Sequence, residues 1–181
     1  MMLLIALFMT LTLTKPVYAL EKESVATASL SMREVEATKT ADTRVLKLEK
    51  YLESKDSPFA HDAKHFVEEA DRLGLDWKLV AAIAGNESYF GQLIPYNSNN
   101  AWGWAVYTGM SYGANFVDWK EGVTIVSEGL KENYIGEGKV TLTDIGSKYA
   151  ADPMWANKVA HFMNEIDEYT PADIELFEID A

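Results

Sequence analysis

The chain has 181 residues, which is enough for one domain and not comfortably for two. It contains no cysteine and three histidines, so disulfides and a thiol nucleophile are excluded, and neither a metal site nor a cofactor is expected. Its formal net charge of −12 at pH 7 makes nucleic acids and anionic membrane surfaces unfavourable partners.

The first 19 residues differ in character from the rest of the chain. A short apolar run from Leu3 to Thr14 precedes Val17-Tyr18-Ala19, a pattern typical of signal-peptide cleavage sites. The run is too short to span a bilayer as a permanent helix. We therefore predict a signal peptide over residues 1–19, an exported protein, and no stable membrane insertion after cleavage; an uncleaved anchor is the alternative.

Residues 20–42 are rich in Ala, Ser, Thr, Glu and Lys and lack a sustained apolar period, which predicts a flexible tether. From Thr43 onward, helical spacing appears. A short amphipathic helix is indicated by Val45, Leu48 and Leu52.

Two further helices are predicted next. Ser57 is expected to cap the second helix, with Pro58 at its first position, and Gly74 to end it. Asp76 is expected to cap the third helix, over residues 77–87.

The segment from Gly91 to Phe116 follows neither a helical nor a strand period. It combines Gly, Asn and aromatic residues, and short turn or hairpin pieces fit this composition. A loop of about 25 residues is unusual in a compact domain unless it has a function.

Helical spacing returns at Asp118, and a short helix over residues 143–149 and a last helix starting near Asp152 complete the pattern. These segments predict a mostly α domain over residues 43–167, with one long aromatic, Gly- and Asn-rich loop and at most a small β-hairpin. Residues 168–181 form an acidic tail.

Glu87 is the acid whose position is most unusual. Val80 and Ile83 precede it by seven and four residues, so on a helix the three share one face, and that face is apolar. A carboxyl group there loses solvation, which favours its protonated form. Such a group suits the proton donor of a glycosidase. The alternative is an ordinary acid at a helix end that reaches water.

The sequence around Glu87 resembles a known superfamily. Residues 82–91, Ala-Ile-Ala-Gly-Asn-Glu-Ser-Tyr-Phe-Gly, are similar to the segment around the catalytic acid of lysozyme-like proteins. Residues 99–104, Asn-Asn-Ala-Trp-Gly-Trp, resemble the Asn-Asn-x-aromatic-Gly segment of bacterial endo-β-N-acetylglucosaminidase domains, and lytic transglycosylases carry a related segment. Weaker similarities at residues 116–123 and 148–159 extend the resemblance over most of the stretch from Leu52 to Met163.

Several residues of the matching segments are candidates for contact with a sugar. The indoles of Trp102 and Trp104 could stack on pyranose rings or could belong to the core. Asn100 could hold the loop in shape or contact an N-acetyl group. The candidate substrate-binding residues are Ser88, Asn100, Trp102, Gly103, Trp104 and Tyr107.

A second carboxylate would help to define the reaction. Asp118 and Glu121 are nearest in sequence, but Asp-x-x-Glu at a helix start is a variant of the capping box. By resemblance, Tyr149 would contact the sugar and stabilise positive charge; otherwise it is an aromatic residue of the core. His61 and His65 lie four apart on one helix, but without a third ligand we expect no metal there.

The resemblance implies a lysozyme-like domain of a monomeric protein that is secreted or held in the cell envelope. Its partner would be the glycan strand of peptidoglycan, cleaved in the manner of an endo-β-N-acetylglucosaminidase, with Glu87 as general acid and Tyr149 assisting. A lytic transglycosylase is the first alternative. A non-catalytic module for glycan binding or wall assembly is the second, and a secreted adhesion or scaffold protein is the third.

Overall fold

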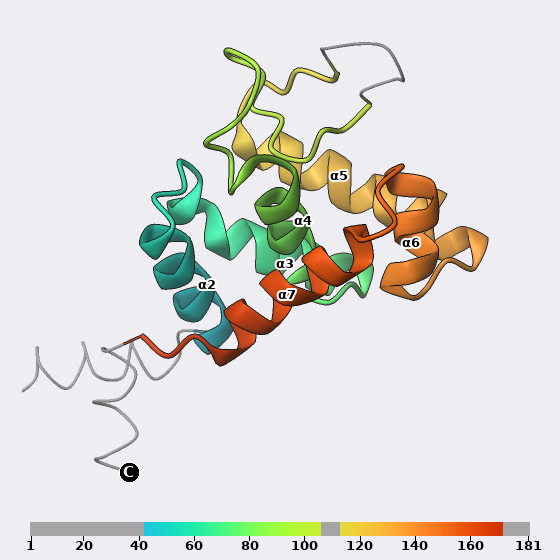
Figure 1. The fold of residues 1–181 in the computed structure, drawn as a ribbon. Coiled ribbons are helices and arrows are strands. Elements are labelled where there is room, and N and C mark those ends of the chain that lie inside the picture. Colours follow the sequence, from blue (N-terminus) through green and yellow to red (C-terminus); the bar gives the residue numbers. More distant parts are fainter. Residues whose placement is uncertain (1–41, 106–112, 172–181) are drawn as a thin grey trace, which may run out of the picture. The chain divides into compact units, whose positions relative to one another are not determined.

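Helices account for the regular structure in the computed structural model, which describes residues 42–105 and 113–171 (Figure 1). No β-strand occurs within these two ranges, and the predicted mostly α fold is confirmed. The predicted signal peptide, nearly all of the tether and the tail beyond residue 171 lie outside the described residues, so their boundaries stay predictions. In the described part of the chain, no helix is long and apolar enough to cross a membrane.

Helix α2, Thr43–Ser54, lies where the first amphipathic helix is predicted. Its N-terminus is capped by Asp42, whose carboxylate accepts the backbone N–H of Arg44 at 2.9 Å. The residues that α2 buries are Leu48, Tyr51 and Leu52. Because the ion pairs at its start are exposed and contribute little, burial of this face holds α2 in place.

The start of the next helix differs from the prediction. A short 3-10 helix, η1 (Ala60–Asp62), precedes α3 (Ala63–Leu73). Ser57 does not cap α3: its hydroxyl accepts the N–H of Phe59 at 3.4 Å and donates to the carbonyl of Phe90 at 3.1 Å. The serine therefore fastens a turn to a distant part of the chain, which local sequence cannot indicate.

The boundaries between α3 and α4 are partly as predicted. Gly74 ends α3 in the left-handed conformation, with φ of 65°. Asp76 accepts the N–H of Lys78 at 2.9 Å, but the helix begins only at Leu79, two residues after the predicted start at Trp77.

Helix α4, Leu79–Ser88, is the central helix of the fold. All residues from Leu79 to Gly85 are buried, so α4 is apolar around its whole circumference and not only on one face. It packs against α5 (Trp119–Asn133) and α7 (Trp155–Glu168), and Figure 1 shows α7 crossing it. Within α4, partly exposed polar side chains therefore occur only in the last turn.

The two acids at the start of α5 form a helix cap. Asp118 Oδ1 accepts the backbone N–H of Glu121 at 2.8 Å, and the Glu121 carboxylate accepts the N–H of Val117. The capping interpretation of Asp118 and Glu121 is confirmed.

The remaining helices follow the predicted order. After a 3-10 turn, η2 (Ile135–Glu137), helix α6 covers Leu142–Tyr149, one residue earlier than predicted. Thr141 and Asp144 form a complete capping box at its start. Helix α6 packs against α7, which begins at Trp155. This pair of helices brings the C-terminal part of the chain to the end of α4.

Candidate active site

Glu87 lies in the last turn of α4 and is half-buried. Its Oε1 accepts two N–H groups, from the indole of Trp155 at 2.7 Å and from the amide of Asn86 at 2.9 Å. Trp155 is buried and is the first residue of α7. These two hydrogen bonds hold the carboxyl group in one orientation. Both are accepted by Oε1, so Oε2 is the oxygen that can interact with a bound molecule.

The backbone after Glu87 turns sharply. Tyr89, Phe90 and Gly91 all have positive φ, of 50°, 57° and 86°. The first two are strained for residues with a side chain, and such strain is concentrated at functional sites. The turn directs the buried Phe90 ring under Gly85, where a Cβ would come within 2.7 Å of it, and leaves Tyr89 48% exposed.

Ser88 fastens this turn to the long loop. Its side chain is buried, and its Oγ donates to the carbonyl of Ala101 at 2.8 Å and accepts the N–H of Gly91 at 2.8 Å. These contacts use its hydrogen-bonding capacity inside the protein. The structure therefore gives the Ser88 side chain a structural position instead of the predicted contact with substrate.

Asn100 closes the loop on itself. Its amide nitrogen donates to the carbonyls of Trp104 and Ala114, each at 2.9 Å, while Oδ1 accepts the N–H of Trp104 at 2.9 Å. Since Asn100 is also buried, it holds the loop in shape, which is one of the two predicted roles. A contact of its amide with an N-acetyl group does not fit this arrangement.

Trp102 lies in the core instead of the predicted groove. Its side chain is fully buried, its Nε1 donates to the carbonyl of Val80 at 2.9 Å, and its ring stacks against Phe59 at 6.1 Å. A buried ring cannot stack on a sugar, so the core interpretation holds for Trp102. Its indole fixes the loop against the first turn of α4.

Gly103 places a backbone segment without a side chain next to Glu87. It is exposed, with φ of 59°, and a Cβ at this position would lie 3.5 Å from Glu87 Oε2. Trp104 is half-buried, packs on Tyr134 and Tyr149, and covers Gly129, which has no room for a Cβ. Of the predicted loop residues, Gly103 is the one found beside Glu87, whereas Tyr107 lies outside the described residues.

Tyr149 lies close to the acid but is engaged with the protein. Its hydroxyl donates to the carbonyl of Trp102 at 2.7 Å, and its ring stacks on Trp155 with centroids 4.9 Å apart. Burial raises the pKa of the Tyr149 hydroxyl well above its usual value, and the nearby Glu87 adds to the effect. The phenol therefore stays neutral, and its ring supports the indole that holds Glu87.

Two open cavities lie near the N-terminal part of α7. One, of about 520 Å³, includes Glu87, Tyr89 and Phe162, and the other, of about 460 Å³, includes Trp155 and Asp152. Asn157 lines both, so they adjoin each other. Glu87 lines the first cavity only.

Two residues of these cavities, Trp155 and Tyr89, were not among the predicted site residues. Trp155 could not be paired with Glu87, because a hydrogen bond across 68 positions leaves no local signal. Tyr89 could have been noticed, since it follows Glu87-Ser88 directly and a helix end directs such a residue outward.

Acidic groups near Glu87 are few. Residues 88–117 contain no Asp, Glu, Lys or Arg at all. Asp118 and Glu121 cap α5, and Asp152 is paired with Lys158 at 2.6 Å. That hydrogen bond keeps the pKa of Asp152 below its usual value. Among the described residues, no second carboxylate shares the cavity of Glu87.

No protein-family model matches the chain. A search of curated proteins finds similarity to a protein of Streptococcus pneumoniae serotype 4 strain TIGR4 named "Putative endo-beta-N-acetylglucosaminidase", 28% identical over 140 residues, or 74% of this chain and 21% of the relative. A protein of the same name from Streptococcus pneumoniae strain R6 is also 28% identical over 140 residues, 20% of its length. The chain thus spans about a fifth of the length of these relatives. The similarity supports a glycosidase-like relationship and nothing finer.

Proposed function

We propose that this protein cleaves the glycan strand of peptidoglycan as an endo-β-N-acetylglucosaminidase, through a lysozyme-like domain with Glu87 as general acid. The observation that carries the proposal is the position of Glu87: it ends a buried helix, is held by the Trp155 indole and opens on a cavity. The names of the Streptococcus pneumoniae relatives support the choice of reaction.

The two oxygens of Glu87 have different roles in this mechanism. Oε1 accepts N–H groups from Trp155 and Asn86, so Oε2 is the oxygen assigned to proton transfer in this mechanism. Oε2 faces the backbone of Gly103, where the absence of a side chain lets a glycosidic oxygen approach. As the proton leaves and the sugar becomes oxocarbenium-like, the two donors stabilise the charge that develops on the carboxylate.

Because no second acid shares the cavity of Glu87, a group of the substrate itself is assigned as the nucleophile that attacks the anomeric carbon. With residues 88–117 uncharged and Asp118 committed to a helix cap, the N-acetyl group of the sugar is the available internal nucleophile. Water then opens the resulting intermediate. In a lytic transglycosylase the sugar's own 6-hydroxyl would attack instead, and this alternative also needs only one acid.

Digestion of purified peptidoglycan, followed by mass spectrometry of the products, tests the proposal. Reducing-end GlcNAc is the expected product. Reducing-end MurNAc would indicate a muramidase, and 1,6-anhydro-MurNAc ends a transglycosylase. Binding of the glycan without any cleavage would replace the enzyme with a glycan-binding module.

Export is a separate part of the proposal and rests on residues 1–19. Expression of the full chain in a bacterial host should yield secreted or envelope protein whose N-terminus begins at Leu20. Retention inside the cell with an intact Met1 would contradict it.

Trp155→Phe tests the proposed role of the indole in holding Glu87. Phe keeps an aromatic ring against Tyr149 but loses the N–H that donates to Oε1. A hydrogen bond to a charged group contributes about 1.5–3 kcal/mol, so kcat should fall by about 10- to 100-fold. Because Trp155 also lines the second cavity, kcat is measured at saturating concentrations of a soluble glycan fragment, so that any change in KM is recorded separately.

Trp119→Phe is the matched control for this variant. Trp119 is also the first residue of a helix, and its ring packs on Phe59, away from Glu87. It should retain the wild-type kcat. An equal loss in the two variants would mean that Trp155 acts only through stability.

A further inference from the structure

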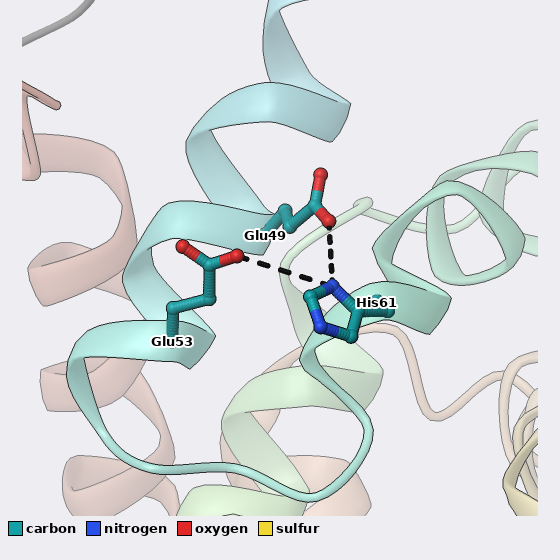
Figure 2. A group of neighbouring side chains, drawn as sticks. All are labelled: Glu49, Glu53 and His61. Atoms are coloured by element: carbon teal, nitrogen blue, oxygen red, sulfur yellow. Dashed lines mark hydrogen bonds and ion pairs between the residues drawn. The ribbon is translucent and has the colours of Figure 1, made fainter.

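His61 faces two carboxylates of α2. Glu49 and Glu53 lie one helical turn apart, and the imidazole of His61 in η1 reaches both (Figure 2). Its Nδ1 is 3.0 Å from an oxygen of Glu49 and 3.9 Å from one of Glu53. One ligand atom from each of the three side chains lies within 4.8 Å of the others.

This group already attracts a proton. The hydrogen bond from Glu49 raises the pKa of His61, and the charges of Glu49, Glu53 and Asp62 raise it further. Lys50 occupies the second oxygen of Glu53 at 3.0 Å, which leaves Oε1 directed at the ring. Two carboxylate oxygens directed at one imidazole nitrogen concentrate negative charge at one point of the surface, where a cation can bind.

The spacing suits a small metal ion. In a tetrahedral zinc site with bonds of about 2.0–2.1 Å, ligand atoms lie about 3.4 Å apart. The distances of 3.0 and 3.9 Å bracket this value, and all three ligand atoms lie within 4.8 Å of one another. His61 is exposed and the two glutamates are half-buried, so both access and adjustment are possible.

We propose that Glu49, Glu53 and His61 bind one divalent transition-metal ion of the zinc type. An imidazole nitrogen with two carboxylates favours zinc and its neighbours over calcium and magnesium, which prefer oxygen ligands alone. Water would complete the coordination. The pair considered from sequence, His61 with His65, is not the site, because His65 bonds instead to Thr124 of α5 at 2.9 Å.

The ion would stabilise the turn between α2 and η1, which packs against the residues that follow Glu87. The turn between α2 and η1 carries Ser57, which bonds the carbonyl of Phe90, and Phe59, whose ring leaves no room for a side chain on Gly91. Metal bound to both sides of the turn would steady it. The expected role is therefore structural and does not depend on the proposed glycosidase activity.

Titration of the metal-free full chain with zinc chloride tests the proposal. Calorimetry should give one ion per chain, and zinc at ten times Kd should raise Tm by about 5 °C. Calcium and magnesium at the same concentration should cause no shift. The zinc effect should be weaker at pH 6 than at pH 7.5, because protonated His61 cannot act as a ligand.

Single His variants locate the site, since the chain has three His in all. H61A and the double variant E49Q/E53Q should lose the zinc-induced shift, while H65A and H161A should keep it. Circular dichroism before titration confirms that each variant is folded. No zinc binding, or binding by H61A equal to wild type, would overturn the proposal, whatever the outcome of the peptidoglycan assay.

Discussion

Glu87→Gln is expected to lower the rate of glycan cleavage by about 10²- to 10⁴-fold, the usual contribution of a general acid. Gln has the same shape and can still accept the N–H of Trp155 through its carbonyl oxygen, so the fold should persist, but it carries no transferable proton. The measurement is release of reducing ends from purified peptidoglycan, with the thermal unfolding of both proteins recorded alongside.

Glu132→Gln provides the matched control. Glu132 lies at an exposed position of α5, so Glu132→Gln removes the same charge as Glu87→Gln but away from the candidate site. This variant should cleave at the wild-type rate. Full activity of Glu87→Gln would remove the acid from the mechanism, whereas loss of activity in both variants would point to a general effect of charge.

Trp102→Ala is expected to cost about 3–5 kcal/mol in the free energy of unfolding, as for other large-to-small changes at fully buried aromatic positions. The variant loses the packing against Phe59 and leaves the carbonyl of Val80 without its indole partner. Urea denaturation followed by circular dichroism gives the value.

Trp77→Ala is the comparison for this loss. Trp77 is only half-buried and packs at the edge of the core. Its replacement should cost clearly less. If Trp102→Ala left stability unchanged and weakened only glycan binding, the ring would belong to the groove and the core assignment would be wrong.

The helices were largely predictable because their signals are local. The left-handed Gly74 and the Asp118 cap act within a turn of their own positions, and both lie at helix ends as predicted. Ser57 shows where this fails: its hydroxyl has a long-range partner in Phe90, and that contact outweighs the local capping pattern.

The candidate site was predictable only in part, for a related reason. Glu87 stood out because an acid is rare next to so many buried residues. The loop composition predicted a functional segment but not which rings are buried, since an irregular backbone has no period from which the direction of a side chain can be inferred. Trp102 consequently lies inside and Tyr89 outside, and the Trp155 partner of the acid is visible only in the fold.

For the proposed glycan substrate, the charge distribution predicts different effects of salt on association and on dissociation. The chain as a whole is acidic, with a net charge of −12, so an anionic wall polymer would be repelled at long range. Salt screens that repulsion and should raise the association rate. Residues 88–117 carry no charged side chain, so contacts that a sugar made with this segment would not be screened. The dissociation rate of a bound strand should therefore hardly respond to ionic strength.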